Sequence, residues 1–152
     1  MKKLFYITLV IPFIIGCSNK SSYKGQKIQL NYVENGSLVT ATTKQLFDDA
    51  FTNKIDGVYY IGDDTCKACA NLKPKIKSWC EKNHANIYEI EFTKIDEEGL
   101  KYLVDATVGY YVWTEKSSVP AVYFFMQGEV ITRSDEENTI KYLKEYVEVK
   151  KG

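Results

Sequence analysis

The hydrophobic pattern of the chain switches repeatedly between a two-residue period and a helical period. Alternating runs or runs of β-branched and aromatic residues predict strands, and apolar residues three or four positions apart predict amphipathic helices. The predicted strands are 28–32, 58–61, 87–92, 121–126 and 130–133, and the predicted helices are 43–51, 66–82, 96–107 and 140–147. The order β-α-β-α-β-α-β-β-α predicts an α/β domain with a central mixed sheet and helices on both faces.

Turn and capping residues separate these elements. Asn35-Gly36 indicates a turn, and Thr42–Gln45 matches a helix capping box. Gly62–Thr65 predicts a turn between a strand and a helix, and Gln127-Gly128 predicts the turn of the final hairpin.

The N-terminal segment has the features of an export signal. Lys2 and Lys3 precede Leu4–Ile15, an uncharged stretch that is shorter than the roughly 20 residues needed to span a bilayer. The charged region, the short apolar region and the small residue Gly16 predict a cleaved signal peptide over residues 1–16. A short membrane helix or a buried first helix is the alternative interpretation.

Ile14-Ile15-Gly16-Cys17 resembles the lipobox of bacterial lipoproteins, in which cleavage precedes a cysteine that carries a diacylglyceryl group. The resemblance implies that Cys17 is lipidated and that residues 17–27 are the lipidated cysteine and a polar, flexible tether. Residues 28–152 then form the domain. Such a protein is anchored in the cell membrane and faces the extracytoplasmic side, and a second acyl chain would make the anchoring stable.

Composition narrows the class of protein. The 20 basic and 20 acidic side chains give no net charge, which argues against nucleic-acid binding. A length of 152 residues with a 45% hydrophobic share favours one globular domain and excludes a disordered chain. Because 4 cysteines are too few for a disulfide-dense scaffold, each cysteine is interpreted individually.

The pair of cysteines in Cys66-Lys67-Ala68-Cys69 lies where a predicted strand passes into a predicted helix. Cys66 therefore falls at or near a helix N-terminus, where free backbone N–H groups and the helix dipole stabilise a thiolate. Lys67 adds a cation nearby, and Cys69 is placed to close a disulfide with Cys66. The pattern predicts a nucleophile with its own resolving thiol, and a structural disulfide is the alternative.

A zinc site is a competing interpretation, because Cys66, Cys69, Cys80 and His84 have the residue types and spacings of a Cys3His site. On one helix, however, Cys69 and Cys80 would lie about 16 Å apart along the axis. Ligands at about 2.0–2.3 Å from one ion do not bridge that gap, so no metal site is predicted. Cys80 is interpreted as a buried, inert thiol and His84 as a surface or capping residue.

From Thr43 to Val149 the sequence resembles the thioredoxin superfamily through an ordered set of features. A strand runs into Cys66-x-x-Cys69, Pro74 lies in the following helix, Ser118-Val119-Pro120 precedes a strand, and a hairpin turn follows. The resemblance implies a thioredoxin-like fold. The segment Tyr59-Tyr60-Ile61-Gly62-x3-Cys66-x2-Cys69 also resembles the bacteriocin-transport accessory branch of these proteins.

The resemblance implies a role for each of these residues. Cys66 is the exposed attacking thiolate and Cys69 the buried resolving thiol, and the two form a redox-active disulfide. Pro120 is expected to be cis and to lie beside the pair, although the start of an edge strand also explains a proline there. Val119 is expected to offer backbone hydrogen bonds to an extended client segment, next to Lys67 and Ala68.

Several features depart from the common thioredoxin pattern. Thr65 replaces the usual Trp, Lys67-Ala68 replaces Gly-Pro, and Tyr60 stands where many thioredoxins bury an acidic residue that assists the resolving thiol. These differences suggest a dedicated client. The segment 107–118 is an extension whose aromatic residues suit either a client surface or ordinary packing (Tyr110, Tyr111 and Trp113).

The sequence therefore predicts a thiol–disulfide oxidoreductase that needs no metal or organic cofactor. Its expected partners are cysteine-containing client proteins or peptides, a membrane or extracytoplasmic electron partner, and the membrane itself through the lipid anchor, with no nucleic acid. Reductase and oxidase use the same steps in opposite order. The alternative is a non-enzymatic accessory or chaperone module of a bacteriocin or protein export system with a structural Cys66–Cys69 disulfide.

Overall fold

The computed structural model describes Tyr23, residues 25–107 and residues 118–151. The expected signal peptide, Cys17 and the aromatic residues of the 107–118 extension (Tyr110, Tyr111 and Trp113) lie outside the described residues. In chain order the elements are β1 (Ile28–Asn31), β2 (Leu38–Thr40), α1 (Thr43–Phe47), η1 (Asp48–Thr52), β3 (Gly57–Gly62), α2 (Lys67–Asn83), β4 (Ile87–Glu91), η2 (Phe92–Lys94), α3 (Glu97–Thr107), β5 (Ala121–Met126), β6 (Glu129–Ser134), α4 (Thr139–Tyr146) and β7 (Val147–Lys150).

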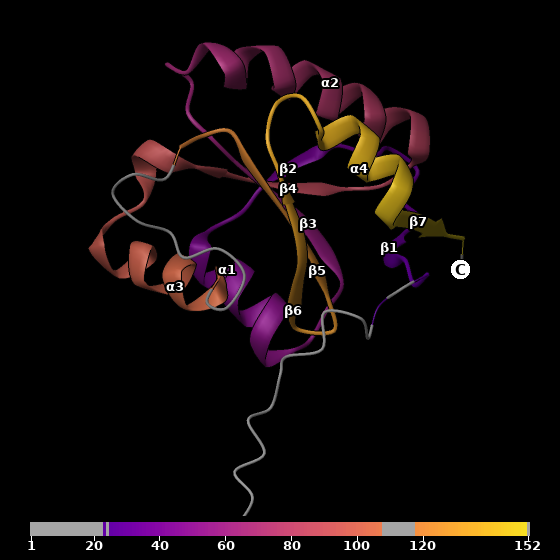
Figure 1. Cartoon of the computed structure of the whole chain (residues 1–152), viewed down its shortest axis with the longest axis horizontal. Coiled ribbons are helices and arrows are strands. Elements are labelled where there is room, and N and C mark those ends of the chain that lie inside the picture. The colour runs from indigo at the N-terminus through magenta and orange to yellow at the C-terminus, as the bar shows by residue number, and fades with distance from the viewer. Residues whose placement is uncertain (1–22, 24, 108–117, 152) are drawn as a thin grey trace, which may run out of the picture.

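A five-stranded mixed sheet forms the centre of the domain, with strand order β2-β4-β3-β5-β6. The strands β2, β4 and β3 are parallel to one another, whereas β5 runs antiparallel to both β3 and β6. The helices α2 and α4 lie on one side of this sheet, and α1 and α3 lie on the other (Figure 1). The predicted α/β class, the mixed sheet and the two helical layers are therefore confirmed.

The two ends of the domain pair in a way that the sequence did not predict. Strands β1 and β7 form a separate two-stranded parallel sheet, in register from Ile28 opposite Val147 to Asn31 opposite Lys150. The prediction that the last helix includes Val147 is wrong, since α4 ends at Tyr146. The β-branched residues of Val147–Lys150 favour a strand, and β1 supplies the backbone partner.

Three further boundaries differ from the sequence prediction. Leu38–Thr40 forms β2 beside β4, a strand too short to show a period of its own. The predicted first helix is a short α-helix that continues as the π-helical segment Asp48–Thr52. The predicted strand 87–92 ends at Glu91, because Phe92–Lys94 forms a 3₁₀ turn.

Local side-chain hydrogen bonds explain where several elements begin and turn. The Gln45 N–H donates to Thr42 Oγ1 at 3.1 Å, which confirms the predicted cap of α1. The Gly99 N–H donates to Asp96 Oδ1 at 2.7 Å in the same way at the start of α3. Gln127 (φ 51°) and Gly128 (φ 91°) both have positive φ, as a two-residue type I′ hairpin turn requires.

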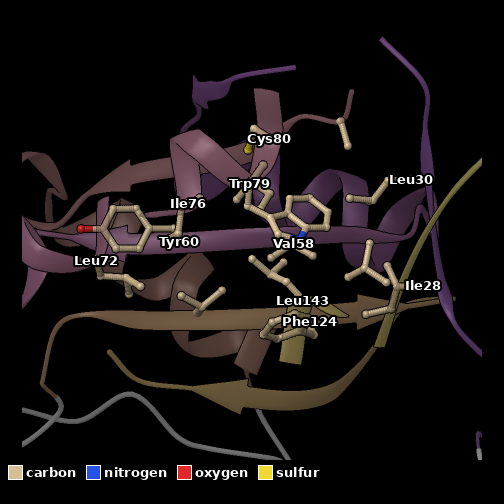
Figure 2. Packing of buried hydrophobic residues seen from close by; sticks show 14 of the residues in the cluster. Ile28, Leu30, Val58, Tyr60, Leu72, Ile76, Trp79, Cys80, Phe124 and Leu143 are labelled. Carbon is tan, nitrogen blue, oxygen red and sulfur yellow. The ribbon is translucent and has the colours of Figure 1, made fainter. Parts of the chain in front are cut away.

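The core consists of two clusters, one on each face of the central sheet. The cluster on the α2 and α4 side is shown in Figure 2 and also receives β1 and β7. Its largest members include Ile28, Val58, Tyr60, Leu72, Ile76, Trp79, Phe124 and Leu143. The cluster on the α1 and α3 side includes Leu46, Tyr59, Ile61, Leu103, Tyr123 and Phe125. Successive residues of β3 therefore serve opposite faces, as a strand requires.

The packed domain begins before residue 28. Tyr23 packs against the cluster on the α2 side, and the Gln26 N–H donates to the Tyr23 carbonyl at 3.0 Å in a turn. This part of the predicted tether is therefore in contact with the domain. No helix among the described residues is both long enough and apolar enough to cross a membrane.

Gly36 is a sensitive position, because a Cβ there would overlap the Cys80 carbonyl and approach the Ala85 backbone N and O at 2.6 and 2.7 Å. These are backbone atoms at the end of α2 that do not give way easily. Gly36→Ala is expected to lower the free energy of unfolding by about 2 kcal/mol, measured by urea denaturation. The neighbouring Asn35→Ala serves as a control within about 0.5 kcal/mol. Equal stability of the two variants would contradict this account.

Candidate active site

The turn that follows β3 sets up the first cysteine. Asp63 Oδ1 accepts hydrogen bonds from both the Thr65 N–H and the Thr65 hydroxyl at 2.7 Å. These two bonds hold the pKa of Asp63 below its usual value. The Cys66 N–H then donates to the Asp63 carbonyl at 3.1 Å. The turn residues predicted from the sequence therefore direct the chain from the end of β3 into α2.

Cys66 is the N-cap residue of α2. Its backbone is extended (φ −84°, ψ 119°), and its Sγ accepts the Cys69 N–H at 3.2 Å. A sulfur in this position lies at the positive end of the helix dipole and receives a backbone hydrogen bond, both of which stabilise a thiolate. Cys66 is half-buried, so its sulfur is not sealed inside the core. The predicted placement at the helix N-terminus is confirmed.

The loop before β5 lies on the other side of the Cys66 sulfur. The Val119–Pro120 peptide bond is cis, as the resemblance implied. The Cys66 thiol donates to the Val119 carbonyl at 3.6 Å. Antiparallel pairing of β3 with β5 places Ile61 opposite Ala121, which brings this loop to the end of β3. Of the other expected client-binding residues, Lys67 is exposed and Ala68 half-buried in the first turn of α2.

Cys69 differs from Cys66 by its burial, with only 2% of its surface exposed. The pKa of Cys69 is raised to about 11, mainly by burial and to a smaller extent by the side-chain hydrogen bond with Cys66. Hydrogen bonds from the Asp63 backbone and the Tyr60 side chain act in the opposite direction. Cys69 is therefore a protonated thiol at neutral pH. Both cysteines are free thiols in this structure, so the disulfide between them stays a prediction.

Cys80 and His84 lie at the far end of α2. Cys80 is fully buried, and burial raises the pKa of this thiol to about 11. His84 is the C-cap residue in the left-handed conformation (φ 54°), and its N–H donates to the Cys80 carbonyl. The predicted buried thiol and capping histidine are confirmed. Cys69 and Cys80 share one helix, and the described part of the chain contains no cluster of three potential metal-ligating side chains.

A charged group behind the cysteines was missed by the sequence analysis. Lys73 Nζ lies 2.6 Å from Glu89 Oε1 and 3.4 Å from Asp64 Oδ1. These three side chains are among those that line a cleft of about 600 Å³, whose other lining residues lie mainly in or next to β2, α1, β4 and α3. Two signals could have found the pair: Lys73 follows Cys69 by one helical turn, and Glu89 shares a strand face with the buried Ile87.

No family model and no curated protein matches this sequence. Solved structures do match its fold. Thioredoxin O1 from Arabidopsis thaliana matches with a TM-score of 0.54 and 17% identity, covering 75% of this chain and 100% of that one. Malassezia sympodialis thioredoxin matches at 0.54 and 13%, covering 75% and 94%, as does thioredoxin f from spinach chloroplast in its short form. The chain therefore has the thioredoxin fold, with Cys66 and Cys69 at the start of α2 and a cis-proline loop beside them.

Proposed function

We propose that the protein is a membrane-anchored, extracytoplasmic thiol–disulfide oxidoreductase that acts on cysteines of exported proteins or peptides. One observation carries the proposal. The Cys66 sulfur caps α2, accepts the Cys69 N–H at 3.2 Å and faces the Val119 carbonyl of the cis-proline loop at 3.6 Å. The arrangement joins a stabilised attacking thiolate, a resolving thiol and a backbone edge where a client could lie.

In the reductase direction, the Cys66 thiolate attacks one sulfur of a client disulfide. A bond forms between Cys66 and that sulfur, and the other client sulfur leaves as a thiolate that takes up a proton. Cys69 loses its proton and attacks the Cys66 sulfur, which releases the second client sulfur and leaves a Cys66–Cys69 disulfide. The client gains the two electrons that the cysteine pair loses. Of the two protons that the client takes up, one replaces the proton of Cys69 and the other comes from solvent, which received the Cys66 proton when the thiolate formed. The oxidase direction is the reverse of these steps.

Client recognition is proposed to use the surface around the Cys66 sulfur. An extended client segment would pair with the backbone of Val119 next to Pro120, as a strand added to an open edge. Lys67 and Ala68 border the sulfur from the first turn of α2, where Lys67 presents an exposed cation. The missing Gly-Pro and Trp of common thioredoxins leave this border different in shape, which supports a dedicated client.

Serine variants of the two cysteines are expected to block different steps of the reaction. Cys66→Ser should abolish reduction of a disulfide-containing client, because no attacking thiolate remains. Cys69→Ser should still attack but accumulate the mixed disulfide, which non-reducing gels and mass spectrometry detect. Cys80→Ala removes a fully buried thiol near the other end of α2, so it serves as the matched control with unchanged turnover.

Full turnover by Cys66→Ser would contradict the enzyme proposal. If that variant also kept its biological activity, the accessory or chaperone module with a structural disulfide would be the correct interpretation. The reduction potential of the pair then assigns the direction. A value near −270 mV indicates a thioredoxin-like reductase, and a value near −120 mV indicates an oxidant of exported clients.

Anchoring is proposed to depend on Cys17, from the lipobox-like Ile14–Cys17 and the positively charged start of the chain. Cys17→Ser is expected to move the protein out of its lipid-modified, membrane-bound form, measured by fractionation and by mass spectrometry of the N-terminal peptide. The wild-type peptide should begin at a modified Cys17. Unmodified protein that still contains Lys2 in the membrane fraction would contradict the lipid anchor.

A further inference from the structure

Tyr60 places a phenol directly behind the resolving cysteine. Its side chain lies on the α2 face of β3 and is 1% exposed. In Figure 2 its hydroxyl points out of the apolar cluster at the end where Leu72 lies. A Cβ at Gly62 would overlap this hydroxyl, so the phenol extends along the strand toward the turn that leads into the cysteines. The Tyr60 hydroxyl interacts with the side chain of Cys69, and this interaction raises the pKa of Tyr60 and lowers the pKa of Cys69.

The charged groups around this contact come from three segments. Glu89 is the cross-strand partner of Tyr60 on β4 and is 14% exposed. Lys73, one turn after Cys69 on α2, holds Glu89 at 2.6 Å. Asp64, in the turn after β3, reaches the same Lys73 Nζ at 3.4 Å. Glu91, two residues after Glu89 on β4 and opposite Gly62, accepts the Asp64 N–H at 3.3 Å. Cys66 and Cys69 are the titratable groups on the α2 side.

Tyr60 can only donate to the sulfur at neutral pH. Burial, together with the neighbouring Cys69 and Glu89, raises the pKa of Tyr60 well above its usual value. The phenol therefore keeps its proton. Cys69 also begins as a thiol, since burial raises its pKa to about 11. When Cys69 loses its proton to attack Cys66, the Tyr60 O–H lies where the sulfur becomes negatively charged.

We propose that Tyr60 stabilises the Cys69 thiolate in the resolving step by donating its O–H to Sγ, and that the Glu89–Lys73 pair sets the strength of this effect. The inference rests on the proposed function, because it concerns the second half of the same reaction. The Cys69–Cys66 bond forms, the Cys66–client bond breaks, and the client sulfur leaves with the electron pair. The proton released by Cys69 passes through solvent to the client thiolate, and the Tyr60 proton stays in place.

Removing either member of the ion pair is expected to shift the pH midpoint of the resolving step, and the two shifts have opposite signs. An unpaired Glu89 carboxylate would oppose the nearby thiolate, whereas an unpaired Lys73 ammonium would favour it. Lys73→Met is therefore expected to move the pH midpoint of the resolving step upward, and Glu89→Gln to move it downward, each by about one pH unit. Lys75→Met, which removes an exposed lysine of the same helix, is the matched charge control.

Stopped-flow reaction of the reduced, full-length protein with 2,2′-dithiodipyridine separates the two steps. Cys66 releases the first thiopyridone, and Cys69 releases the second when it resolves the mixed disulfide. All variants also carry Cys17→Ser, so that the Cys17 thiol does not react with the reagent. A Cys69→Ser variant, which cannot resolve the mixed disulfide, identifies the first phase. Tyr60→Phe is expected to slow the second phase about tenfold, the effect of losing a hydrogen bond to a charged group. Tyr59→Phe removes a hydroxyl on the opposite face of the same strand and is the matched control.

The outcomes distinguish this inference from the proposed function. Loss of the first phase in the parent protein would mean that Cys66 is not the attacking thiol, and the proposed function would fail. A normal first phase with an unchanged second phase in Tyr60→Phe would refute the inference alone. If Lys73→Met and Glu89→Gln shift the pH midpoint in the same direction, the proposed role of the Glu89–Lys73 pair is refuted. Circular dichroism of each variant checks that the fold is retained.

Discussion

The antiparallel pairing of β3 with β5 is the constraint on which the candidate site depends. Neighbouring antiparallel strands begin where their partners end, so the segment after β3 meets the segment before β5. The register that places Ile61 opposite Ala121 brings Val119 to Cys66, across 53 positions of sequence. In the proposed function the two segments act together, because one supplies the sulfur and the other supplies the backbone edge beside it.

The second determinant is how far the core extends toward this edge. Cys69, Tyr60 and Leu72 belong to the same buried cluster, whereas Cys66 lies at its boundary. One helical turn therefore takes the chain from a half-exposed sulfur at a helix end to a sulfur enclosed by apolar side chains. Burial disfavours the ionised form of Cys69, which keeps its proton at neutral pH. The proposed division between attack by Cys66 and resolution by Cys69 thus rests on this difference in packing.

The sequence predicted an element correctly where its residue pattern was compatible with only one kind of secondary structure. The apolar spacing of α2 and the apolar run of β5 predicted those elements, and the cysteine and proline motifs predicted the site. Val147 was assigned to the wrong element because it continues the helical spacing of Ile140 and Leu143 as well as it begins a strand. Val147–Lys150 forms a strand because it pairs with the backbone of β1, which lies more than a hundred residues earlier in the sequence. The Lys73–Glu89 pair was missed for the same reason, since it depends on how β4 and α2 lie against β3.

Tyr60 is proposed to support the Cys69 thiolate with a neutral hydrogen-bond donor, where many thioredoxins bury an acidic residue. A carboxylate at position 60 could take up the thiol proton and become neutral, whereas a carboxylate that stays ionised there would repel the thiolate. A phenol that keeps its proton offers a donor without adding charge. The negative charge here belongs to Glu89, and Lys73 balances it at 2.6 Å, so the pair as a whole repels the sulfur little. Burial then remains the largest opposition to ionisation of Cys69, and the phenol and the ion pair determine how much of it is offset.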